Sequence, residues 1–431
     1  MANNNENKVL NVPTKREQCQ TCSSTAERAE LRPKGNVPNL RFPEFTGEWE
    51  KITLKDTVKI QGGFAFKSEL FQEVGVPIIR ISNLPQDSSF VDLTNCVYYL
   101  EGNYRNFEIN KGELLIAMSG ATTGKTAIYN LDYISYLNQR VGCFKANDKI
   151  HYPFLYALVD CKSFKTQLST KLIAGAQPNI SSTDIESIKV SIPTITEQQK
   201  IASLLLLLDE RIATQNKIID KLQSLISGLN DFLHLQVGGL STSFEELGTS
   251  YSGLSGKSGD DFGKGKPYIT YLNIYSNSIV NEEQVDYVVI GDNEKQNTLL
   301  YGDLLFTLSS ETPDEVGIGA VYLGESDKYY LNSFCFGLHM TATNKVYSPY
   351  LAYLVSNSVF RKFIYPLAQG STRFNLQKND FMKKKFLLPT FENQKGIART
   401  LNALSSKLET ERKLLLNYQE QKQYLLGSMF I

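Results

Sequence analysis

The chain has 431 residues, of which 42% are apolar, and it carries 45 basic and 45 acidic side chains. This length is more than one hydrophobic core usually supports, so we expect at least two domains. The apolar content is that of a globular protein, no apolar run approaches the roughly 18 residues of a membrane span, and zero net charge counts against a nucleic-acid binder that acts alone.

The first 36 residues are polar, and we expect them to be largely disordered. They contain no apolar run of the kind found in signal peptides, and the six cysteines show no disulfide framework, so we expect a cytoplasmic protein. Cys19 and Cys22 form a lone CxxC motif with no second pair beside it. Two incidental cysteines are a better interpretation than a metal site, and we predict no metal in this chain.

Residues 37–194 form the first predicted domain. Short apolar runs at 77–81, 113–118 and 188–192 are bounded by Gly, Asn, Asp or Pro, which predicts strands. Pro153 suits the first turn of a helix, and we expect that helix at 154–168. The predicted class is α+β, with a mixed α/β arrangement in each domain.

One loop of this domain, residues 119–126 with the sequence SGATTGKT, looks like a phosphate-binding loop. That motif requires a glycine four residues removed from the Gly-Lys pair, and Ser119 stands at that position. We therefore do not expect nucleotide hydrolysis. The loop is better interpreted as a Gly/Thr-rich segment that approaches a DNA backbone or base edges.

Residues 195–235 predict a long helix with apolar residues at alternating spacings of four and three, which is typical of a coiled coil. Residues 204–208 are an uninterrupted run of five leucines, wider than one seam requires. We expect a third helix, from a partner protein, to pack there. The seam positions are Ile201, Leu205, Leu208, Ile212, Gln215, Ile219 and Leu222.

Residues 236–390 form a second domain that repeats the first. Residues 75–83, 111–115 and 136–139 match 265–273, 301–305 and 330–333, and Asn179 matches Asn375. The clearest match joins 193–202 to 389–398, at the start of both long helices. We interpret the repeat as a frame with pseudo-two-fold symmetry that reads a two-part target; a gene duplication without such a target is the alternative.

Residues 391–431 predict a second long helix, in which Glu411 stands where the first seam has Gln215. A pseudo-two-fold axis would place the two helices antiparallel, so we predict an antiparallel coiled coil whose polar positions fix the register. The alternative is that each helix packs on its own domain or on another chain. The second seam comprises Ile397, Leu401, Leu404, Leu408, Glu411, Leu415 and Tyr418.

Positive charge is concentrated before each helix, most clearly at 361–385, where seven basic residues accompany one acidic residue. Contact with phosphates is one interpretation, and a solvated basic face is the other. Arg reads guanine, and Asn or Gln reads adenine, in the major groove. The candidate DNA-binding residues are Lys67, Arg80, Asn83, Thr122, Thr123, Lys125, Gln139, Arg140, Gln177 and Asn179 in the first domain, and Lys257, Asn273, Ser310, Thr312, Ser371, Thr372, Arg373 and Asn375 in the second.

Motifs for catalysis are missing. The three histidines (His151, His234 and His339) are far apart, and the sequence has neither the Asn-Pro-Pro loop of an amino-methyltransferase nor the carboxylate–lysine pattern of a nuclease. The two repeats share a framework but differ at the polar loop positions. These features favour a binding and organising protein that recognises two different half-sites.

Over residues 37–431 the sequence resembles the specificity subunit of Type I restriction–modification systems. The resemblance rests on residues 38–45 (PNLRFPEF) with Trp49 and Glu50, on the helix start at 193–202 (PTITEQQKIA), and on the order domain–helix–domain–helix. It implies two target-recognition domains on an antiparallel helical pair that acts as a ruler between the halves of an asymmetric double-stranded DNA site.

The resemblance also implies partners. Two methylation (M) subunits would supply S-adenosylmethionine and base flipping, and restriction (R) subunits would use ATP and Mg. No cofactor and no catalytic residue are expected in this chain. A coiled-coil adaptor without DNA binding is one alternative, and a nuclease or methyltransferase with fused specificity domains is the other.

Overall fold

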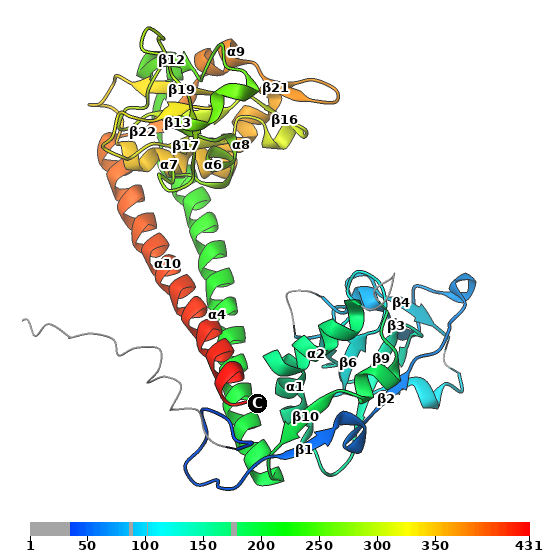
Figure 1. Ribbon diagram of the computed structural model, residues 1–431. Helices are drawn as coiled ribbons and strands as arrows, with labels where there is room; N and C mark the ends of the chain where they lie inside the picture. The colour runs from blue at the N-terminus through cyan, green and yellow to red at the C-terminus, as the bar shows by residue number, and fades with distance from the viewer. Residues whose placement is uncertain (1–34, 86–88, 101, 174–178) are drawn as a thin grey trace, which may run out of the picture. The chain divides into compact units, whose positions relative to one another are not determined.

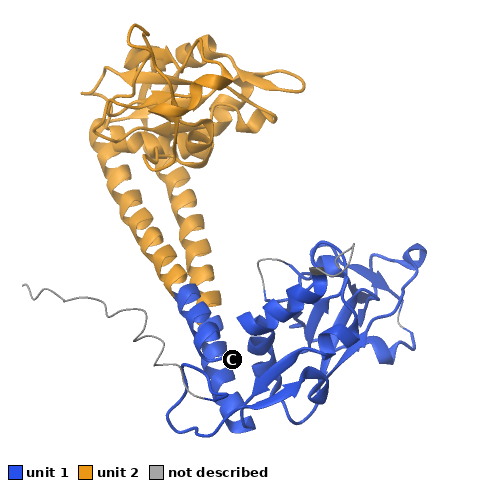
Figure 2. Cartoon of the chain, in the orientation of Figure 1, with its two compact units in different colours: residues 1–210, 418–431 blue, residues 211–417 orange. Residues whose placement is uncertain are grey.

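The computed structural model describes residues 35–85, 89–100, 102–173 and 179–431. Cys19 and Cys22 lie outside the described residues. The chain forms two compact units, residues 1–210 with 418–431 and residues 211–417, which Figure 2 colours blue and orange. Among the described residues, no helix has both the length and the apolar character to cross a membrane.

The first unit is built on two four-stranded sheets and a two-stranded ribbon. One sheet is antiparallel, and the other contains the parallel pair β3–β8. Their orders are β2 (Val58–Gly62), β9 (Val141–Ala146), β6 (Leu114–Ala117), β7 (Thr126–Ile128), and β4 (Val97–Tyr99), β3 (Val76–Ile79), β8 (Ser135–Leu137), β5 (Glu108–Ile109). The ribbon pairs β1 (Glu50–Thr53) with β10 (Lys189–Ile192).

The helix predicted at 154–168 is two helices, α1 (Tyr152–Asp160) and α2 (Lys162–Ile173), because Cys161 between them has an extended backbone. The short helix α3 (Ser182–Glu186) follows, with Ser181 as its N-cap. Single 3-10 turns lie at η1 (Leu54–Asp56), η2 (Ser68–Leu70), η3 (Ile81–Asn83) and η4 (Arg105–Phe107). Inward-facing residues of both sheets, such as Ile79, Leu115 and Leu137, share one core.

The second unit repeats this topology. Its antiparallel sheet has the order β12 (Gly248–Ser252), β19 (Cys335–Met340), β15 (Leu304–Thr307), β17 (Gly319–Val321). A second sheet has the order β14 (Val285–Val288), β13 (Phe262–Ile269), β18 (Tyr330–Leu331), in which β13 and β18 are parallel as β3 and β8 are. The ribbon β11 (Gly239–Thr242) with β22 (Phe386–Pro389) corresponds to β1 with β10, so the predicted duplication is confirmed in the fold.

A small sheet is additional in the second unit, with the order β16 (Ser309–Ser310), β21 (Phe374–Leu376), β20 (Ala368–Gln369). The helices are α5 (Phe244–Leu247), α6 (Tyr271–Ser276), α7 (Ser348–Ser356), α8 (Ser358–Ile364) and α9 (Lys378–Lys383), with 3-10 turns η5 (Gly259–Asp261), η6 (Pro313–Glu315) and η7 (Tyr365–Leu367). Asn357 separates α7 from α8 because its side chain accepts hydrogen bonds from Val359 and Phe360 as an N-cap.

The two long helices are α4 (Ile195–Gln236) and α10 (Phe391–Ser428), which run side by side in Figure 1. In the second unit, Gln215 contacts Glu411, whereas Asn230 and Asn402 bond the same residue, Tyr353. Residue numbers thus rise along α4 as they fall along α10, which is the antiparallel arrangement. All fourteen predicted seam residues are buried or half-buried, and the predicted fold class is confirmed.

The repeated helix start has a structural explanation. The buried Gln198 side chain donates to the carbonyl oxygens of Pro193 (2.9 Å) and Lys149 (3.2 Å) and accepts from the His151 N–H (2.8 Å). Gln394 does the same with Pro389, Lys345 and Tyr347, at 2.7, 2.8 and 2.8 Å. Each glutamine therefore ties the first turn of its long helix to the loop that precedes a domain helix.

The residue before each of these glutamines differs between the copies, Glu197 in the first and Asn393 in the second, and local contacts explain the difference. Glu197 is 1% exposed, and both of its oxygens accept from the Arg41 guanidinium at 2.7 Å. Trp49 donates to the same carboxylate at 3.3 Å and packs on Phe430. The PNLRFPEF segment thus fastens the start of α4, and the exposed Asn393 takes this position in the second copy.

The N-terminal boundary requires one correction. Asn36 was assigned to the polar segment, but it is buried, and its side-chain amide donates to the Trp49 carbonyl and to Ser191. The packed chain therefore includes residues just before Val37.

Candidate nucleic-acid interface

Three segments of the first unit that are far apart in sequence meet at one end of β6. The Met118 N–H donates to the Arg140 carbonyl at 2.9 Å, which joins the loop after β6 to the turn between β8 and β9. The Ile180 N–H donates to the Met118 carbonyl at 2.9 Å, and Ser119 forms a bridge with Asn179. Loop 119–125, turn 138–140 and Asn179 therefore form one surface.

Six of the ten candidate DNA-binding residues of the first domain lie on this surface. Gln139, Arg140 and Asn179 are exposed, and Thr122, Thr123 and Lys125 of the loop are half-buried. The loop connects β6 to β7 as a hairpin, whereas a phosphate loop joins a strand to a helix. The interpretation that it is not a nucleotide-hydrolysing loop is consistent with this geometry.

The loop also leaves polar atoms without partners. Among the described residues, the hydroxyl oxygens of Ser119 and Thr122 and the Nε atom of Arg80 are buried and form no hydrogen bond. Buried polar groups in folded proteins are nearly always paired, with protein, water or ligand. Two of these atoms, the hydroxyl oxygens of Ser119 and Thr122, lie in this loop, which is consistent with a surface that is completed by something it binds.

The second unit builds the same surface from matching positions. The Leu308 N–H donates to the Phe334 carbonyl at 2.9 Å, and the Leu376 N–H donates to the Leu308 carbonyl at 2.8 Å. Ser309 pairs with Asn375 across β16 and β21, as Ser119 bridges Asn179 in the first unit. The frame is thus the same in both domains, and the side chains on it differ.

The hairpin between β20 and β21 carries the exposed residues of this second surface. Its loop projects from the body of the unit beside the β21 label in Figure 1. Ser371, Thr372, Arg373 and Asn375 are all exposed, and the guanidinium of Arg373 lies over the Phe334 ring at 5.7 Å from its centroid.

An acidic loop, residues 311–315, borders the same surface. Tyr275 donates to Glu315 at 2.6 Å and Ser310 donates to it at 2.9 Å, and these hydrogen bonds hold the pKa of Glu315 below its usual range. Ser310 is nearly buried and positions this carboxylate, while Thr312 is exposed. An ionised carboxylate here repels phosphates and can accept from the cytosine amino group, so this loop suits a base edge better than a backbone.

Three of the predicted readers are structural residues in this fold. Asn83 and Asn273 are each 1% exposed, and their amide groups bond backbone atoms of their own turns. Lys257 is paired with Glu294, and this contact lowers the pKa of Glu294 to about 2. The amides of Asn83 and Asn273 are held by backbone atoms, and the charge of Lys257 is matched by Glu294. None of the three side chains is therefore part of the candidate interface.

Two further predictions have mixed outcomes. Arg80 donates to the Asn95 carbonyl at 3.0 Å, so it is partly committed to its own domain, whereas Lys67 is exposed beside η2. Gln177 lies outside the described residues.

The basic stretch 361–385 is partly internal, since Arg361, Lys378 and Lys384 are half-buried. Arg361 donates to three backbone carbonyls that include Gly317 at 2.6 Å, and burial lowers its pKa. Lys384 donates to the Phe363 carbonyl, and Lys385 pairs with Glu246. Lys362, Arg373 and Lys383 are exposed, as is the paired Lys385, so phosphate contacts from this stretch rest on fewer charges than the sequence indicates.

Sequence reasoning missed Phe334, although a signal for it existed. The match of residues 136–139 with 330–333 extends by one position, which pairs Arg140 with Phe334. The two residues occupy the same place on the frame, since each carbonyl accepts from the residue after β6 or β15.

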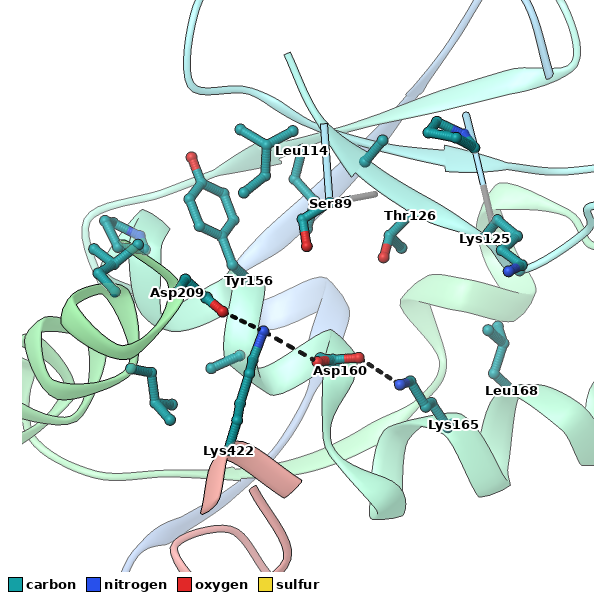
Figure 3. A pocket seen from close by; sticks show the side chains of 18 of the residues that line it. Ser89, Leu114, Lys125, Thr126, Tyr156, Asp160, Lys165, Leu168, Asp209 and Lys422 are labelled. Carbon is teal, nitrogen blue, oxygen red and sulfur yellow. Dashed lines mark hydrogen bonds and ion pairs between the residues drawn. The ribbon is translucent and has the colours of Figure 1, made fainter. Parts of the chain in front are cut away.

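A cavity of about 550 Å³ in the first unit lies between α1, α2, β7 and the long helices, and Thr123, Gly124 and Lys125 of loop 119–125 also line it (Figure 3). Lys422 reaches across it, with its Nζ atom 2.7 Å from Asp209 and 3.9 Å from Asp160. The charge of Lys422 is therefore matched by two carboxylates. The described residues contain no group of His, Cys, Asp and Glu side chains suited to a metal ion.

Comparison with known proteins identifies the family. The model of the Type I restriction modification DNA specificity domain matches residues 46–224 and again residues 248–418. The chain belongs to this family. Its members are specificity subunits, the non-catalytic components of their complexes, so the prediction that this specificity subunit is not itself an enzyme is confirmed.

Two curated relatives come from Methanocaldococcus jannaschii. The MjaVIII specificity subunit is 32% identical over 183 residues, which span 40% of this chain and 42% of that relative. The putative MjaX specificity subunit is 24% identical over 91% of this chain and 95% of its own length. The match to the MjaVIII subunit thus covers less than half of that relative, whereas the match to the MjaX subunit covers nearly all of both chains.

Solved structures share the fold. The crystal structure of the S subunit from M. genitalium has a TM-score of 0.54 and 18% identity, covering 92% of this chain and 99% of its own. A chain from a study of complex assembly and conformational transition of the type I R-M system has a TM-score of 0.57 and 14% identity, covering 89% and 97%.

Proposed function

We propose that this specificity subunit recognises a bipartite, asymmetric sequence in double-stranded DNA, one half by each domain. The observation that carries the proposal is the shared frame with different side chains. The turn after β8 presents Gln139 and Arg140, whereas the turn after β18 presents Ser333 and Phe334. Two domains with the same backbone arrangement but different exposed side chains suit two different half-sites.

The proposed contacts are of two kinds. Arg140, Gln139 and Asn179 in the first domain, and Arg373 and Asn375 in the second, have the forked donors and acceptors that distinguish bases. Most of the remaining candidates suit phosphate oxygens or the groove rim, namely Thr122, Thr123, Lys125, Arg80 and Lys67 in the first domain, and Ser371 and Thr372 in the second. Thr312 lies in the acidic loop 311–315 and therefore suits a base edge.

We also propose that the long helices bind the methylation subunits. On α4, Ile218, Leu225 and Phe232 are exposed by 38, 52 and 56% and recur every seven residues, outside the seam occupied by Ile219 and Leu222. In the first unit, Leu207 of the five-leucine run is 60% exposed. A second apolar stripe at heptad spacing fits another helix, which supports the expectation of a third helix from a partner.

The chemistry would then belong to the partners. Two methylation subunits would bind S-adenosylmethionine and flip the target adenine, and restriction subunits would use ATP and Mg, in the cytoplasm where the DNA lies. The chain's zero net charge fits this division, because much of the nonspecific affinity for DNA could come from a more basic partner.

Selection of DNA sequences tests the proposal. The chain is co-expressed with its methylation subunits, and bound duplexes are recovered from a random pool and sequenced. A two-part motif with a fixed gap supports the proposal. Recovery of the complex without enrichment of any sequence indicates the coiled-coil adaptor instead, and methyl transfer by the isolated chain indicates a fused enzyme.

A further inference from the structure

The turn between β18 and β19 places an aromatic ring where the first domain has a guanidinium. Phe334 and Arg140 hold the same backbone position, since each carbonyl accepts at 2.9 Å from the residue after the central strand. Phe334 is 55% exposed at this position. A single exposed apolar residue is ordinary on a protein surface, so its meaning depends on its surroundings.

Phe334 is surrounded by candidate DNA-binding residues of the second domain. The Arg373 guanidinium lies 5.7 Å from the centre of the Phe334 ring, and the pairing of Ser309 with Asn375 fixes the base of the hairpin that carries it. A guanidinium held over a ring loses less freedom when it bonds a ligand, because its plane is already oriented. Phe334 and Arg373 thus form a composite surface with one apolar and one forked cationic part.

We propose that this pair reads a thymine beside a guanine in the half-site of the second domain. This inference rests on the proposed function. The thymine 5-methyl is the apolar group that the major groove presents, and phenylalanine is among the side chains that contact it. Arg373 would donate to O6 and N7 of the neighbouring guanine, the commonest specific contact of arginine.

Phe334 can offer a base no hydrogen bond, so its discrimination depends on the methyl group alone. Deoxyuridine pairs as thymidine does and lacks that group. In the full complex with methylation subunits, each thymine of the selected duplex is replaced in turn by deoxyuridine, and Kd is measured at constant salt. One thymine, next to a guanine, should weaken binding about fourfold when replaced, which is the effect of burying one methyl group.

Three variants make the test specific. Phe334→Ala should bind thymine and deoxyuridine duplexes equally, while Phe334→Leu retains most of the preference because it keeps an apolar side chain. Leu387→Ala is the control, since Leu387 is 64% exposed on β22, away from this surface, and its loss should leave the preference unchanged. Both positions are exposed, so the three variants should fold.

The possible outcomes separate this inference from the proposed function. If no bipartite motif is recovered, the proposed function fails. If a motif is recovered but every thymine tolerates deoxyuridine, or the half-site of the second domain has no thymine, the methyl contact is refuted. It is refuted equally if Phe334→Ala weakens both duplexes alike, because that result describes a ring wedged between base steps in the minor groove.

Discussion

Replacing Gln198 by alanine should destabilise the first unit far more than an ordinary surface change at the helix start. Its side chain is 0% exposed and makes three hydrogen bonds, to the carbonyl oxygens of Pro193 and Lys149 and from the N–H of His151. The alanine leaves three backbone groups without these partners, each at about 1–3 kcal/mol. We expect a total loss of about 3–5 kcal/mol, since water reaches some of them.

The assay uses a natural probe. Trp49 is the one tryptophan of the chain and is 3% exposed against Phe154 and Phe430 in the first unit. With an m-value of about 3 kcal/mol/M in urea, the midpoint of its fluorescence transition should move down by about 1–1.7 M. Gln199→Ala is the matched control, because Gln199 is exposed on the same helical turn. Equal midpoints for the two variants would refute the role assigned to the buried amide.

Three further predictions concern α10, α4 and the interface. Gly396 lies within α10 with open space around it, so Gly396→Ala should raise stability by about 0.5–1 kcal/mol in thermal unfolding; a loss would contradict the helix assignment. Burial lowers the pKa of His234 below its usual 6.5, so its contribution to stability should be complete above pH 6.5 and decrease below it. His234→Gln should flatten this pH dependence of the free energy of unfolding in urea titrations between about pH 7.5 and 5.5. An unchanged pH profile in the variant counts against the buried neutral form. Arg140→Ala should relax specificity at one base pair of one half-site by about 1–3 kcal/mol, and uniform weakening on all sequences would reassign Arg140 to a phosphate.

Much of the architecture follows from sequence patterns. The seam could be predicted because a period of 3.5 requires the positions of Leu205 and Leu401 to face a partner helix, and both are buried. The duplication was visible at the helix starts because Gln198 and Gln394 make the same three bonds. The break at Cys161 was not predictable, because the sequence carries neither Gly nor Pro there.

The candidate interface was predictable in part. Loop position and residue type placed Gln139, Arg140 and Arg373 correctly on exposed turns. The same criteria selected Asn83 and Asn273, because a loop asparagine that caps its own turn has the same sequence appearance as one that faces a ligand. Phe334 was missed because residues were sought for their hydrogen bonds, whereas its exposure arises from the tertiary frame.

Selection of bound DNA by the complex with methylation subunits, repeated after exchange of residues 236–390 for the corresponding domain of another specificity subunit, tests the central claim most directly. The account predicts a two-part motif of which one half changes while the other half remains. A change in both halves, or no motif at all, would contradict the assignment of one half-site to each domain.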